Sequence, residues 1–172
     1  MHTATADTEI PSAVRSVTFA SLGSRFVAQI LDALAMFGVF FVVGSFFAML
    51  FGGATEGGFE LTGIAGGLFI AVEIVLVLGY FVICEARWGA TLGKLAAGIR
   101  VQSTTGQRIG YGAALVRNLM RVVDMLPGFY LTGVISILLT KRKQRLGDLV
   151  ADAVVVRPES GRGLRVAAAA LA

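Results

Sequence analysis

The chain has 172 residues, of which 56% are hydrophobic and 15% charged, and its mean hydropathy is +0.79. This composition is too apolar for an ordinary soluble domain, and the length excludes several folded domains, so we predict one membrane-embedded domain. The net charge of +4 comes from basic residues in loops beside apolar runs, where membrane topology and anionic lipids explain them without nucleic acid. A single cysteine and a single histidine argue against an internal disulfide and against a cysteine or histidine metal site.

Residues 1–22 are polar, contain Pro11 and show no sustained apolar period. We predict a mostly disordered cytoplasmic tail here. The segment lacks the basic start and apolar core of a cleaved signal peptide, so the first hydrophobic helix is expected to act as an uncleaved anchor.

Two apolar runs follow, at 25–51 and 61–84, and each is long enough to cross a hydrocarbon core of about 30 Å. A glycine-rich turn at 52–60, with two acids and no base, joins them, whereas basic residues flank their other ends. The positive-inside rule therefore predicts that both outer ends are cytoplasmic.

Within the next segment, 85–110, "GATLGKLAAG" predicts a short amphipathic helix on the membrane surface. "IRVQSTTGQRIGY", residues 99–111, predicts a cytosolic β-hairpin around a turn at Gly106. "ADAVVVRP", residues 151–158, is a β-branched run that can add a third strand.

The apolar run at 111–140 is interrupted by charged side chains and by Pro127–Gly128. Proline removes a helix donor, and with glycine it favours a break. The basic sequence "KRKQR", residues 141–145, must lie on the same side as residue 117 by the positive-inside rule, which one crossing cannot satisfy. We therefore predict a short or re-entrant helical hairpin.

The predicted fold is an all-α integral membrane helical bundle. It has two full transmembrane helices, a third hydrophobic segment broken at Pro127–Gly128, and a small cytosolic β-hairpin. The membrane domain covers 23–157, its part from 141 onward is a C-terminal cytosolic segment, and 158–172 is predicted to be a flexible tail.

"RFVAQILDAL", residues 25–34, and "RNLMRVVDML", residues 117–126, each place an aspartate seven positions after an arginine. Helical periodicity puts both side chains of each pair on one face. The two stretches look like a degenerate parallel repeat, and transporters commonly bind their substrates between such repeats. Asp32 lies about 10 Å deeper than Arg25, so it must face the bundle interior, because an unpaired carboxylate in hydrocarbon costs several kcal/mol.

Glu73 lies near the middle of the second apolar run, without a base in that run, and we interpret it as functional by the same rule. The alternative is structural: the arginines reach the membrane interface, and Asp32 pairs with Arg117 or Arg121 to hold helices together. The candidate cation-binding, proton-binding or ion-pair residues are Arg25, Asp32, Glu73, Arg117, Arg121, Asp124 and Asp148.

Four basic residues after the third apolar run are expected to bind lipid headgroups and set topology. They are Lys141, Arg142, Lys143 and Arg145. Asp148 can also pair with Arg145, three positions earlier.

These residues carry a resemblance to the RDD family of small bacterial membrane proteins, named for one arginine and two aspartates. The family's arginine at the start of helix one matches Arg25, its aspartate within that helix matches Asp32, and its second aspartate matches Asp148 in "QRLGDLVADAVVV". "ATLGKLAAGIRV", "RNLMRVVDMLP" and "KRKQRLGDL" also resemble the family's usual run, so the resemblance covers about 22–157. Asp152 departs from the family pattern, which has glycine-threonine before the valine run. The resemblance implies a location in the bacterial cytoplasmic membrane, and transport of ligands or cation/proton exchange.

We predict secondary transport of a monovalent cation in exchange for protons, with Asp32 and Glu73 as protonatable ligands whose pKa values Arg25 and Arg117 tune. A homo-oligomer is expected, because four short helices enclose little volume. The alternative is a non-transporting accessory or scaffold subunit of a larger membrane complex. The sequence contains no histidine cluster, no nucleophile beside a base and no phosphate loop, so we predict neither an enzyme nor a cofactor.

Overall fold

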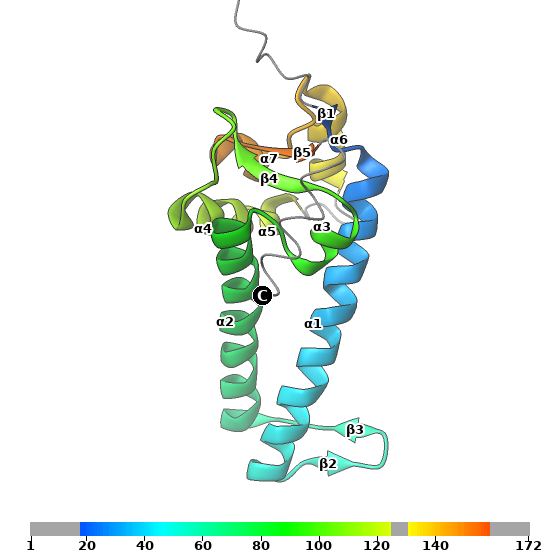
Figure 1. The fold of residues 1–172 in the computed structure, drawn as a ribbon. Coiled ribbons are helices and arrows are strands. Elements are labelled where there is room, and N and C mark those ends of the chain that lie inside the picture. The colour runs from blue at the N-terminus through cyan, green and yellow to red at the C-terminus, as the bar shows by residue number, and fades with distance from the viewer. Residues whose placement is uncertain (1–17, 125–130, 159–172) are drawn as a thin grey trace, which may run out of the picture.

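Two long antiparallel helices dominate the computed structural model, which describes residues 18–124 and 131–158 (Figure 1). They are α1 (Leu22–Phe51) and α2 (Gly63–Trp88), and both are long and apolar enough to cross a membrane. Most of their large apolar side chains are exposed, which is the pattern of a surface that faces lipid. The prediction of two long apolar helices is confirmed.

A cap of short elements lies at one end of the two helices (Figure 1). It comprises β1 (Thr18–Phe19), α3 (Leu92–Ala96), β4 (Arg100–Ser103), α4 (Tyr111–Leu119), α5 (Arg121–Asp124), α6 (Leu131–Leu139), α7 (Leu146–Val150) and β5 (Ala153–Arg157). Within it, α3 packs against α1, and α4 packs against α2.

The opposite end is closed by a hairpin of β2 (Ala54–Thr55) and β3 (Gly58–Phe59), which replaces the simple turn predicted there. The Phe59 ring lies directly over Gly44 of α1, where any side chain would collide with it. Its centroid is 5.5 Å from both Phe40 of α1 and Phe69 of α2. Aromatic packing thus joins the two helices at this end.

The cap contains an antiparallel sheet of strand order β1-β5-β4. Four consecutive buried residues, 153–156, make β5 the apolar centre of this sheet. The predicted β-hairpin around Gly106 forms only at its turn: the Ser103 amide donates to the Gln107 carbonyl at 2.7 Å, but residues 107–110 form no strand, and β4 pairs with β5 instead. The predicted third strand is confirmed as the middle strand. Thr18 and Phe19, which were predicted to belong to the disordered tail, form β1 on its other edge.

The described parts of 111–140 contain three short helices. None exceeds nine residues, about 13 Å, which is too short to cross a bilayer. In the cap, α4 and α5 lie across the end of α2 (Figure 1), and α6 packs against α5 and α7. The predicted break at Pro127–Gly128 and the predicted tails at 1–17 and 159–172 lie outside the described residues.

Candidate functional site

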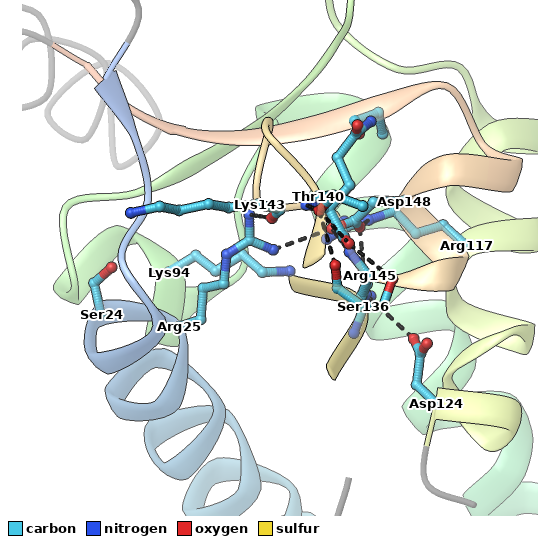
Figure 2. A network of polar contacts seen from close by, with 12 residues as sticks. Ser24, Arg25, Lys94, Arg117, Asp124, Ser136, Thr140, Lys143, Arg145 and Asp148 are labelled. Carbon is cyan, nitrogen blue, oxygen red and sulfur yellow. Dashed lines mark hydrogen bonds and ion pairs between the residues drawn. The ribbon is translucent and has the colours of Figure 1, made fainter. Parts of the chain in front are cut away.

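A fully buried carboxylate, Asp148, is the meeting point of three helical segments where the cap joins α1 (Figure 2). Arg25 of α1 donates from Nη1 to Oδ2 at 3.0 Å, and Arg117 of α4 donates from Nε to Oδ1 at 2.6 Å. Arg145, which caps α7, lies 3.3 Å from Oδ1 through its own Nε, as the three-residue spacing predicted. The Asp148 side chain therefore links α1, α4 and α7.

Glu85, near the end of α2, continues the network. Arg117 donates from Nη1 to Oε2 at 2.5 Å, and Asn118 donates to the same oxygen at 2.9 Å. Lys94 of α3 donates to Oε1. The charges alternate in sign from Lys94 through Glu85, Arg117 and Asp148 to Arg25, so each buried charge has an opposite neighbour.

The alternating charges of the network determine which cap residues are ionised. Burial by itself would lower the pKa of Arg117, but Glu85 and Asp148 raise that pKa above its ordinary value. Burial would raise the pKa of Asp148, but Arg117, Arg145 and Arg25 hold it below its ordinary value. Both groups are therefore charged near neutral pH.

Lys94 is the exception within the cap. Burial lowers the pKa of its ammonium group to about 7, and the Glu85 carboxylate opposes this shift. Lys94 is therefore a group whose charge changes near neutral pH.

Asp32 is buried on α1 and accepts hydrogen bonds from three neutral donors. Tyr80 Oη lies 2.8 Å from Oδ1, Thr91 Oγ1 lies 2.6 Å from Oδ2, and the Gly93 amide lies 2.9 Å from Oδ1. The carboxylate thus holds the start of α3 against α1. The alternative pairing of Asp32 with Arg117 is wrong, because Arg117 is engaged by Glu85 and Asp148. The second alternative partner, Arg121, places its guanidinium 3.9 Å from the centroid of the Phe81 ring.

The predicted repeat extends further than its two ten-residue stretches. Leu92-Gly93-Lys94 and Leu146-Gly147-Asp148 each open a short helix that is followed by a strand of the sheet. A Cβ at Gly93 would collide with the Ala28 carbonyl of α1, and a Cβ at Gly147 would lie 2.8 Å from the Arg117 carbonyl. Each short helix therefore approaches the backbone of the helix that carries the arginine of its own half, α1 or α4.

The aspartates of the repeat have different surroundings. Asp124, the counterpart of Asp32, is buried, and its Oδ2 lies 3.6 Å from Arg145 Nε, which is an ion pair and not a tight hydrogen bond. Burial raises the pKa of Asp124 above its ordinary value, and Arg145 opposes the rise. This finding places Asp124 within the ion-pair group of the cap.

Glu73 stands apart from this network, at the middle of α2. Its side chain is 9% exposed, and its Oε1 is buried without a hydrogen-bond partner in the described structure. Twelve helical positions separate it from Glu85, which corresponds to about 18 Å along the axis.

The predicted lipid-binding group divides in two. Lys141, Arg142 and Lys143 are exposed in the turn between α6 and α7, whereas Arg145 is 7% exposed and pairs with acids of the cap. The backbone carbonyl of Lys143 also accepts from Arg25 Nη2 at 2.6 Å. Arg145 is therefore an ion-pair residue in this structure.

A cavity of about 730 Å³ lies where α1 meets the cap. Five basic residues line it: Arg25, Lys94, Arg117, Arg121 and Arg145. Asp32 is its one acidic lining residue among the described residues. Across 18–124 and 131–158, no three histidine, cysteine or acidic side chains converge into a group that could hold a metal ion.

Sequence reasoning missed four polar residues that shape this site: Tyr80, Glu85, Thr91 and Lys94. Glu85 and Lys94 carry opposite charges on either side of Gly89, where α2 ends in a left-handed conformation. That charge pattern was the available signal.

Two long apolar helices, capped by a buried network of alternating charges, indicate a membrane protein. The model of the RDD family matches residues 19–152, and the chain belongs to this family. Arg25, Asp32 and Asp148, which carried the resemblance, all lie in the matched region. No curated protein and no solved structure matches the chain.

Proposed function

We propose that this membrane protein is a secondary transporter that exchanges a monovalent cation for protons, with Glu73 as the exchanging carboxyl group. The buried, unpartnered Oε1 of Glu73 in the middle of an apolar helix is the observation that carries the proposal. A carboxyl oxygen in hydrocarbon requires a partner, and a proton and a cation are two partners that exclude one another. Competition between them at one oxygen is the chemistry that antiport needs.

The proposal gives Asp32 a different role from Glu73. A cation at Asp32 would have to displace donors from Tyr80, Thr91 and Gly93. The charged residues that line the cavity beside Asp32 are mainly basic, and they repel a cation. Asp32 is therefore a positioning residue for α3, and the cation contacts Glu73.

The proposed location is the bacterial cytoplasmic membrane, with the cap and both termini on the cytoplasmic side. The exposed bases Lys141, Arg142 and Lys143 on the cap support this orientation, and so does the lack of any lysine or arginine in the connection 52–62 at the other end. A homo-oligomer is proposed because two spanning helices cannot enclose a path, and both leave apolar faces exposed.

The second candidate is a non-transporting accessory or scaffold subunit of a larger membrane complex. The observation that favours it is that Arg25, Asp32 and Asp148 are all engaged in contacts within the chain. Residues engaged in this way hold the cap on the helices.

Proton movement in proteoliposomes decides between the two. The native chain should release protons when a sodium or potassium gradient is applied. Glu73→Gln should abolish this flux, whereas Glu56→Gln, the same chemical change at an exposed position, should retain it. The amount of each variant recovered in the proteoliposomes verifies that it has been reconstituted. Absence of flux in the native chain under every monovalent cation gradient would overturn transport and favour the subunit.

A further inference from the structure

We infer that the cavity beneath the cap binds a phosphate group, carried by an anionic lipid or by free phosphate. The inference concerns a different site from Glu73 and does not depend on transport.

The charged residues that line the cavity favour an anionic ligand. Five basic side chains and one carboxylate line it, while the acids Glu85, Asp124 and Asp148 pair with these bases without lining the cavity. Figure 2 shows Arg25, Lys94 and Arg145 extending toward one region from α1, α3 and the start of α7. The charged side chains that border the cavity are therefore mainly basic, and Asp32, the one acid among them, is already bonded to three donors. Such a surface attracts an anion.

Two of the basic side chains have donor hydrogens that no acceptor in the described structure takes up. The Nε of Arg25 is buried and has no hydrogen-bond partner in the described structure. The ammonium group of Lys94 carries three donor hydrogens, of which Glu85 accepts one. The oxygens of a phosphate group are acceptors suited to both donors, through charge-assisted hydrogen bonds.

The shape and walls of the cavity indicate what the phosphate is attached to. At about 730 Å³ the cavity is far larger than one phosphate ion needs. Its other walls are apolar and include Phe26, Val134 and Ile137. Phe26 is 66% exposed on the outer face of α1, so the apolar wall continues onto a lipid-facing surface. These walls match the glycerol and acyl parts of a lipid, whereas the basic lining alone matches free phosphate.

Binding to the purified full-length protein in neutral detergent tests the inference. Calorimetry compares three probes: dihexanoyl phosphatidic acid, inorganic phosphate, and dihexanoyl phosphatidylcholine, whose phosphate is masked by choline. Saturable binding of phosphatidic acid well above that of inorganic phosphate identifies a lipid headgroup. Equal binding of both identifies free phosphate. Binding of neither, or phosphatidylcholine binding as tightly as phosphatidic acid, overturns the inference.

Two variants place the bound phosphate in the cavity. Gly23 lines the cavity, and a Cβ there would meet no atom within 4 Å, so Gly23→Phe should obstruct the cavity without a clash. Gly38→Phe is the matched control, because Gly38 also lies on α1 with open space around it but away from the cavity. Lys94→Gln removes one charged donor and should weaken binding about tenfold. If neither Gly23→Phe nor Lys94→Gln weakens binding relative to Gly38→Phe, the phosphate binds elsewhere and the inference fails.

Discussion

Arg25 and Arg117 bind the two oxygens of a single carboxylate: Arg25 reaches Oδ2 of Asp148 and Arg117 reaches Oδ1. The two arginines occupy equivalent positions in the repeat, one at the start of α1 and the other on α4. Asp148 therefore joins the two halves of the chain through their matching residues. The cap holds its position on the helices through this carboxylate and through the contacts of Asp32.

Arg117→Gln should destabilise the protein by about 3–5 kcal/mol, because it leaves the buried carboxylates of Glu85 and Asp148 without their shared partner. Thermal or denaturant unfolding of the detergent-solubilised protein measures the effect. Lys141→Gln is the control, since an exposed charge contributes about 1 kcal/mol at most. Equal unfolding of the two variants would mean that the network does not stabilise the cap.

Stability should fall in acid because of Asp148. Its arginine partners lower the pKa of the folded carboxyl below the ordinary value of 3.8, so the unfolded chain binds the proton first. The stabilisation is complete above that ordinary value and is lost as pH falls toward the folded value. Unfolding temperature measured against pH should therefore decline below about pH 4. Asp148→Asn should be less stable at neutral pH and show a flatter acid decline; an unchanged profile would contradict this assignment.

Gly93→Ala should destabilise by about 1–3 kcal/mol, because its methyl group would collide with the Ala28 backbone carbonyl, which cannot move aside. Gly38→Ala, in open space in the middle of the same α1 helix that Gly93 contacts, should instead raise the free energy of unfolding by about 0.5–1 kcal/mol through helix propensity. Chemical unfolding of both variants checks the opposite signs. A tolerated Gly93→Ala would show that α3 does not sit closely on α1.

Anion binding in the cavity should weaken as pH rises through about 7, because burial lowers the pKa of Lys94 to about that value. Sulfate is the suitable probe, since its charge is constant between about pH 6 and about pH 8 while Lys94 titrates. The charged groups that act on Lys94 are Glu85 of α2, Arg117 of α4, Arg121 of α5 and Arg145 before α7. Sulfate affinity of Lys94→Gln should be nearly constant with pH. A native chain whose sulfate affinity does not change over this range would exclude Lys94 as the titrating group.

The two long helices could be predicted from the sequence because their length and apolar composition suffice to define them. The strand pairing of the segment around Gly106 could not be predicted from the local sequence in the same way. A local turn signal is present there, but β4 pairs with β5, which has the larger buried apolar face and lies about fifty residues later. Strand pairing across such a separation depends on how the cap folds as a whole.

The candidate site shows a similar division. The depth of Asp32 and Glu73 followed from helix position, and Arg25, Asp32 and Asp148 followed from the family resemblance. The hydrogen-bond partners of these residues could not be predicted. Tyr80, Thr91 and Glu85 take part in the site only after α3 and α4 have turned back onto the ends of the long helices. The arginine–aspartate spacing along one helix indicated a shared face, yet each aspartate is bonded to groups of other elements.

The middle position of β5 fixes an order of assembly. One neighbour, β1, precedes α1, and the other, β4, follows α2, so neither edge of the sheet has its partner until the chain has been made as far as Arg157. Both long helices are therefore synthesised, and available for insertion, before the sheet can close. Until the sheet closes, the strands β1 and β4 present unpaired edges. The pairing of β5 is thus a late step of folding, which joins the two inserted helices and the cap into one folded unit.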